Sequence, residues 1–125
     1  MTRARFQELV AAALDELPDY FRERIHNVVV LVEDYPPGKR PVPGRRRPRA
    51  LERSRPLVMG HFIGVPATQK SVFQVPIGPD RVVLYQKNIE AVCRTDAEIR
   101  EQVRLTVIHE LGHYFGLDED QLRHV

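Results

Sequence analysis

Two histidines and a glutamate toward the end of the chain have the spacing of a metal-centred hydrolytic site. His109, Glu110 and His113 form the pattern His-Glu-Leu-Gly-His. If this stretch is helical, the histidines lie about 40° apart on one face and one turn apart along the axis. Two imidazoles in that arrangement can bind one tetrahedral zinc ion (Zn2+). Glu110 then lies about 100° around the helix from His109, where a carboxylate can act as the general base for a metal-activated water.

The motif is predicted to lie on a long helix that runs from residue 96 to about residue 115. Thr95 and Glu98 form a capping box at its start, and Gly116 is placed to end it. The second half of this helix is apolar nearly all round, apart from the motif and a few small residues, so we expect the fold to enclose it. Histidines and a glutamate buried there would be costly unless a bound metal compensated them.

A zinc ion held by two histidines needs a third protein ligand, and the chain must turn back after the helix to supply it. If the helix continued, Asp120 would lie about 10 Å along the axis from His113, too far for the same ion. Gly116 can adopt the left-handed conformation that makes the turn. The candidates after the turn are Asp118, Glu119, Asp120 and, as a weaker option, His124. Glu119 is favoured because longer zinc motifs, H-E-x-x-H-x-x-G-x-x-H, place their third ligand there.

Upstream segments predict the elements that must support this helix. Residues 4–16 have apolar side chains at helical spacing, and Pro18 can open a second short helix over about residues 18–25. Residues 27–33 are β-branched and apolar, which is typical of a buried central strand. The remaining expected elements are strands at 57–65 and 81–86, a short strand near 71–75 and a short helix at 88–93.

Length and composition predict one domain, residues 1–125, of the soluble globular class. The chain has 125 residues, 42% of them hydrophobic, which is enough for a single buried core. The first residues lack the apolar run of a signal peptide, and the longest apolar run, residues 28–32, is too short to span a bilayer. Cys93 is the only cysteine, so an internal disulfide and a cysteine-based zinc site are excluded. A cytoplasmic protein without a membrane partner is expected.

Residues 34–56 are expected to form a long exposed loop, because they are rich in proline, glycine and arginine. Within this loop, residues 39–55 carry a net charge of +7, whereas the whole chain carries +2. Such a segment could bind nucleic acid or an acidic partner. No aromatic residue lies between Tyr35 and Phe62 to stack on bases. Nucleic acid is therefore disfavoured, and a solvated basic loop is the favoured interpretation.

His61 and Tyr114 are weaker candidates for the site. His61 lies in an expected strand and could line a cleft, since an extended peptide can pair with an edge strand. A surface histidine outside the site is the favoured interpretation. Tyr114 could hydrogen-bond near a metal, but its angle on the helix favours a place in the core.

With these features the chain resembles the small bacterial zincin-like metallopeptidases over roughly residues 5–125. The resemblance rests mainly on residues 107–120 (Val-Ile-His-Glu-Leu-Gly-His-Tyr-Phe-Gly-Leu-Asp-Glu-Asp), with weaker support from segments 27–37, 60–66 and 79–85. It implies an α+β, single-domain zincin-like fold, in which a small mixed β-sheet packs against the motif helix and the N-terminal helices. It also implies zinc as the cofactor, the two motif histidines as ligands, Glu110 as the base, and an acidic third ligand near position 119.

Two functions from different classes compete on the sequence. The leading hypothesis is a zinc-dependent metallopeptidase that cleaves a peptide or protein substrate by metal-activated water, with Glu110 as general base. The alternative is a zinc-stabilised, non-catalytic binding module that uses the basic loop 39–55. The two differ in whether Glu110 is needed for function.

Overall fold

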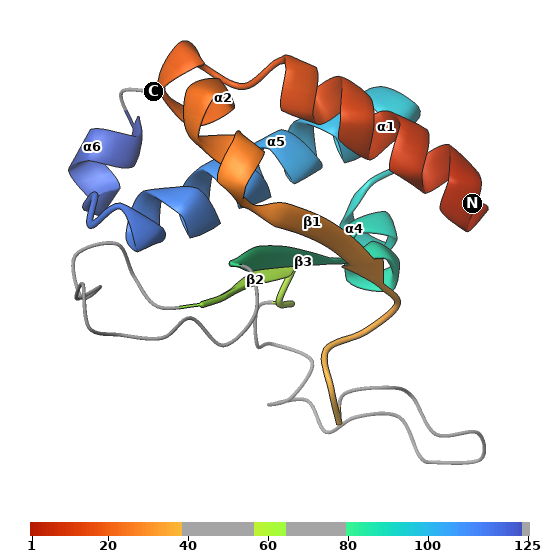
Figure 1. The fold of residues 1–125 in the computed structure, drawn as a ribbon. Helices are drawn as coiled ribbons and strands as arrows, with labels where there is room; N and C mark the ends of the chain where they lie inside the picture. Colours follow the sequence, from red (N-terminus) through yellow and green to blue (C-terminus); the bar gives the residue numbers. More distant parts are fainter. Residues whose placement is uncertain (39–56, 65–79, 124–125) are drawn as a thin grey trace.

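A mixed β-sheet with helices over one of its faces forms the body of the protein. The computed structural model describes residues 1–38, 57–64 and 80–123. Its elements are α1 (Arg3–Asp15), α2 (Asp19–Arg24), η1 (Ile25–Asn27), β1 (Val29–Glu33), β2 (Gly60–Ile63), β3 (Arg81–Tyr85), α4 (Gln86–Val92), α5 (Asp96–Tyr114) and α6 (Glu119–Arg123). The strand order is β1-β3-β2, with β1 parallel and β2 antiparallel to β3. Helices α1 and α5 lie together over the sheet (Figure 1). The α+β fold predicted from the sequence is confirmed.

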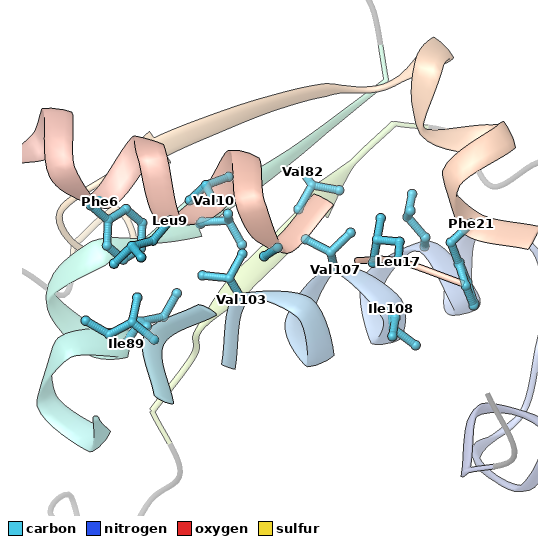
Figure 2. Close-up of a cluster of buried hydrophobic side chains, with 14 of the residues drawn as sticks. Phe6, Leu9, Val10, Leu17, Phe21, Val82, Ile89, Val103, Val107 and Ile108 are labelled. Atoms are coloured by element: carbon cyan, nitrogen blue, oxygen red, sulfur yellow. The ribbon is translucent and has the colours of Figure 1, made fainter. Parts of the chain in front are cut away.

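The core lies where α1 and α5 meet above the sheet. Figure 2 shows Phe6, Leu9 and Val10 of α1 directed toward Val103 and Val107 of α5, and all five side chains are buried. The α1 residues recur at helical spacing, which gathers them on one face of the helix. The two helices are thereby fixed to each other and to the sheet, and α5 has a rigid support along one side.

The position of β1 differs from the prediction. Its apolar run predicts a buried central strand, but β3 occupies the centre of the sheet and β1 lies at an edge. Val29 and Leu31 of β1 are 42% and 40% exposed, whereas Val30 packs against the core. Alternate residues of a strand point to opposite faces, and only one face of β1 is covered by helices. The prediction was wrong because an apolar run does not specify which strand lies between two others.

The other elements lie close to their predicted positions. The strand expected at 57–65 is the shorter β2, and the strand at 81–86 ends one residue earlier because Gln86 begins α4. The predicted strand near 71–75 and most of the basic loop, including all of residues 39–55, lie outside the described residues. Among the described helices, none combines the length and apolar character needed to cross a membrane.

Candidate metal centre

Helix α5 presents its two motif histidines on an open side of the molecule. The helix begins with the predicted capping box of Thr95 and Glu98 and buries Val107 and Leu111 against the core. His109 and His113 are exposed. The expectation that the fold encloses this half of the helix is therefore wrong. Core neighbours cover only part of the circumference of α5, and the histidines occupy the remaining part.

The ring of His109 is oriented by a backbone hydrogen bond. Its Nδ1 lies 2.9 Å from the carbonyl oxygen of Leu105, one turn earlier in α5. A carbonyl oxygen can only accept, so Nδ1 carries the hydrogen and donates it. In the neutral imidazole the other nitrogen, Nε2, then has a free lone pair. Metal-binding histidines are commonly held in this way, with one ring nitrogen donating to a carbonyl and the other free for the ion.

The chain reverses direction directly after α5. Gly116 has a φ of 77°, in the left-handed region that glycine adopts without strain. Its N–H donates to the carbonyl of His113 (3.0 Å), and the N–H of Leu117 donates to the carbonyl of Gly112 (2.8 Å). These two bonds form a Schellman motif, which satisfies the last carbonyls of the helix. The turn expected at Gly116 is therefore present, and it sends the chain back along α5.

Helix α6 packs closely against α5 because Gly112 has no side chain. A Cβ atom at that position would lie 3.1 Å from Cγ and Cδ1 of Leu122 and closer still to its Cδ2. Leu122 is buried and belongs to the hydrophobic core. Gly112, in the middle of the histidine motif, thus makes room for the Leu122 side chain of α6. This contact fixes the position of the residues at the start of α6.

The acidic candidates for the third metal ligand differ in the groups that their side chains contact. The Asp118 carboxylate accepts from the N–H of Gln121, and the Gln121 side chain accepts from the N–H of Asp118, each at 2.8 Å. This reciprocal pair caps the start of α6 and occupies the Asp118 side chain. Asp120 faces Arg123 at 3.6 Å and is exposed. Neither is directed at the histidines, and His124 lies outside the described residues.

Glu119 is the acid that the structure places beside the two histidines. Its Oε1 lies 3.2 Å from Nε2 of His113, and its Oε2 lies 3.7 Å from Nε2 of His109. The carboxylate therefore contacts the outer nitrogen of both rings. Glu119 is the first residue of α6, so the turn at Gly116 and the packing of α6 together bring it there.

The donor types and two of the distances can be compared with those of a zinc site, although no three His, Cys, Asp or Glu side chains in the described ranges are arranged to hold a metal ion. Zinc bonds to nitrogen and oxygen are about 2.0–2.2 Å long, which puts two tetrahedral ligand atoms about 3.3–3.5 Å apart. The two nitrogen–oxygen distances of 3.2 and 3.7 Å fall on either side of that separation. The three donors, two imidazole nitrogens and a carboxylate, are of the types that zinc binds.

Glu110 is held by the edge strand of the sheet. Its Oε2 accepts from the backbone N–H of Phe62 in β2, at 3.0 Å. In an antiparallel pair, residues that exchange hydrogen bonds with the partner strand alternate with residues whose peptide groups point away. The N–H of Tyr85 donates to the carbonyl of Met59, so Met59 is of the first kind and Phe62, three positions on, is of the second. The outward N–H of Phe62 is therefore free to bind Glu110.

The Phe62 side chain ties the same strand to the end of α5. Its ring stacks on that of Tyr114 with centroids 4.4 Å apart, and the Tyr114 hydroxyl donates to Asp80 at 2.8 Å. Tyr114 is buried, as its helical angle predicts. His61, next to Phe62, is exposed and points to the opposite face of β2, away from α5. The strand contributes to the site through its backbone and through Phe62, and His61 is not brought to the metal candidates.

Burial raises the pKa of two side chains, Tyr85 and Cys93. Burial raises the pKa of the Tyr85 phenol, and the negative charges of Glu33 and Glu110 raise it further. Burial also raises the pKa of the Cys93 thiol, with a smaller contribution from Glu98. Cys93 is half-buried and packs against the core, as expected for a structural cysteine.

Comparisons with known proteins identify a family for this chain. No curated protein matches the chain. A solved structure, described as a conserved hypothetical protein from Thermus thermophilus, is 24% identical, with a TM-score of 0.53, over 92% of this chain and 94% of that one. At this identity the likeness concerns the fold alone. A family model described as zincin-like metallopeptidase matches residues 25–125. Since that match spans most of the chain, the protein belongs to the zincin-like metallopeptidase family.

Proposed function

We propose that this protein is a zinc-dependent metallopeptidase that hydrolyses peptide bonds. In this proposal His109, His113 and Glu119 hold the metal, and Glu110 is the general base. One observation carries it: two imidazole nitrogens meet one carboxylate at 3.2 and 3.7 Å on an open face. A second carboxylate, that of Glu110, lies next to His109 in the helix and is fixed by a backbone N–H.

The donors have complementary roles. Zinc, when bound, lowers the pKa of a water to roughly 7 and polarises a carbonyl group. The hydrogen bond from His109 to the Leu105 carbonyl holds that ring with Nε2 outward. Glu110 takes a proton from the attacking water and passes it to the leaving amine. The N–H of Phe62 keeps one oxygen of Glu110 in place, which leaves the other oxygen for the water.

The test is the Glu110→Gln variant, which keeps size and hydrogen bonding but removes the basic carboxylate. We expect one equivalent of zinc and an unchanged unfolding temperature, with cleavage of a peptide library reduced by about 10²–10⁴. Glu101→Gln is the matched control, because Glu101 is an exposed glutamate of the same helix that pairs with Arg104. It should cleave at the wild-type rate. Undiminished cleavage by Glu110→Gln would exclude this mechanism.

The same experiment distinguishes the metallopeptidase from the alternative function, a non-catalytic binding module. A wild-type protein that takes up one equivalent of zinc but cleaves nothing would favour a zinc-stabilised binding module. That alternative rests on the basic segment 39–55, which lies outside the described residues. If the protein takes up no transition metal at all, both functions are excluded.

A further inference from the structure

A groove runs along the exposed side of α5 and ends at the candidate centre. One wall is the segment Leu57–Gly60 that leads into β2, the other is α5, and His109 and Glu110 lie along it. Its volume is about 380 Å³. Ligand pockets in proteins measure about 300–1,000 Å³, so this groove suits a side chain and its adjoining backbone rather than a large ligand.

The groove is lined by apolar side chains that stand open to solvent. Leu57, Val58 and Leu105 are 45%, 48% and 38% exposed, and they come from both walls. Single exposed apolar residues are common on protein surfaces, but a group of them gathered in a depression marks a place where a ligand binds. A charged side chain placed there would lose its hydration without gaining a partner, whereas an apolar one would gain burial.

The start of β2 lines this groove where the strand packs against α5. The hydrogen bond between Tyr85 and Met59 sets the alternation of the strand, so Gly60, like Phe62, points its peptide group away from β3. Gly60 also lines the groove, but it is buried, and a Cβ there would lie 2.7 Å from Cγ2 of Thr106, so α5 packs directly against it. A peptide would therefore enter the groove through a side chain, beside His109 and Glu110, without pairing with β2 at Gly60.

We propose, resting on the proposed function, that the substrate is an extended peptide with a bulky apolar residue beside the bond to be cleaved. That residue occupies the groove between Leu57, Val58 and Leu105. Selection comes from burial of the apolar side chain. Filling such a pocket favours an apolar over a charged residue by about ten- to a hundredfold.

The test uses labelled hexapeptides that differ at one central position: Leu, Phe, Ala, Asp or Lys. Binding is measured by fluorescence anisotropy with the zinc-supplied full chain carrying Glu110→Gln, and cleavage is measured with the wild type. We expect the Leu and Phe peptides to bind and react about ten- to a hundredfold better than the Asp and Lys peptides. Leu105→Gln, and separately Val58→Gln, should remove most of this preference.

Leu31→Gln is the matched control. Leu31 is 40% exposed, close to the 38% of Leu105, and lies in β1 at the opposite edge of the sheet. It should leave the preference unchanged. The inference is overturned if the five peptides bind alike, if Leu31→Gln acts as strongly as Leu105→Gln, or if Leu105→Gln instead dissociates a dimer seen by light scattering.

The outcomes also distinguish this inference from the proposed function. Cleavage without preference at the central position keeps the metallopeptidase and refutes the apolar groove. Preferential binding that Leu105→Gln removes, with no cleavage by the wild type, keeps the groove and refutes the peptidase. Loss of both binding preference and cleavage refutes both.

Discussion

Replacing Gly112 with alanine should loosen the contact that carries Glu119 to the histidines. A Cβ at this position would crowd three atoms of the Leu122 side chain. Because Leu122 is buried, it cannot turn outward without losing apolar contact, and α6 must shift with it. In an open helix, glycine to alanine stabilises by about 1 kcal/mol, whereas overpacking costs about 1–3 kcal/mol. The free energy of unfolding should therefore change little or fall by up to about 2 kcal/mol.

The larger effect of Gly112→Ala should be on zinc. A shift of α6 moves Glu119 from its 3.2 Å contact with Nε2 of His113. Changes to residues that orient metal ligands usually lower metal affinity by about 10–100-fold, and we expect a loss in that range. Glu119→Gln, which removes the charged carboxylate itself, sets the upper limit for comparison.

Zinc affinity is measured by competition with a chromophoric chelator, and stability by urea unfolding without metal. The double variant Gly112→Ala/Leu122→Ala tests the cause, because alanine at 122 removes the atoms that a Cβ at 112 would meet. Leu122→Ala alone should cost about 2–5 kcal/mol. In its presence Gly112→Ala should no longer destabilise, which gives a coupling energy of about 1–3 kcal/mol. A more stable Gly112→Ala protein with wild-type zinc affinity would refute the reasoning.

Two further predictions concern contacts around the sheet. Tyr114→Phe removes the hydroxyl that donates to Asp80 but keeps the ring. The free energy of unfolding, measured in urea, should therefore fall by about 1 kcal/mol. An unchanged free energy would mean that this hydrogen bond contributes nothing to stability. Burial opposes the charge of Glu90, but hydrogen bonds from Gln86 and the Met1 ammonium outweigh it and hold the pKa of Glu90 below its ordinary value of 4.5. The resulting stabilisation is complete above pH 4.5 and disappears as the pH falls through the folded-state pKa. The melting temperature of Glu90→Gln should therefore fall less between pH 5 and pH 3 than that of the wild type, and parallel curves would contradict this.

The parts of the fold that could be predicted from the sequence are those with local signals. Helix α5 begins after the Thr95–Glu98 capping box, and the chain turns at Gly116 after its end. Both features depend on residues only a few positions apart. The edge position of β1 had no such signal. Its β-branched run reports a preference for extended backbone, but the order of strands depends on which segments pair, here residues 29–33 with 81–85.

The sequence around the candidate site contains a capping pattern that distinguishes the acidic candidates from one another. Asp118 and Gln121 stand at the spacing of a capping box, with Asp118 just before the helix and Gln121 at its third residue. An aspartate used as a cap is occupied by the helix backbone. The cap therefore excludes Asp118 as the third ligand, and Glu119 is the first helical residue, whose side chain reaches the histidines.

The hydrogen bond between Phe62 and Glu110 has no counterpart in residue type. Every residue except proline carries the same backbone N–H, so nothing in the sequence marks Phe62 as the donor. The partners are 48 positions apart, and the choice depends on the register of β2 against β3. A slip of one residue would turn the N–H of Phe62 toward β3 and its ring to the other face, which would break both the bond to Glu110 and the stack on Tyr114. The motif thus predicts which side chains can do chemistry, while strand register determines whether Glu110 is held in position to do it.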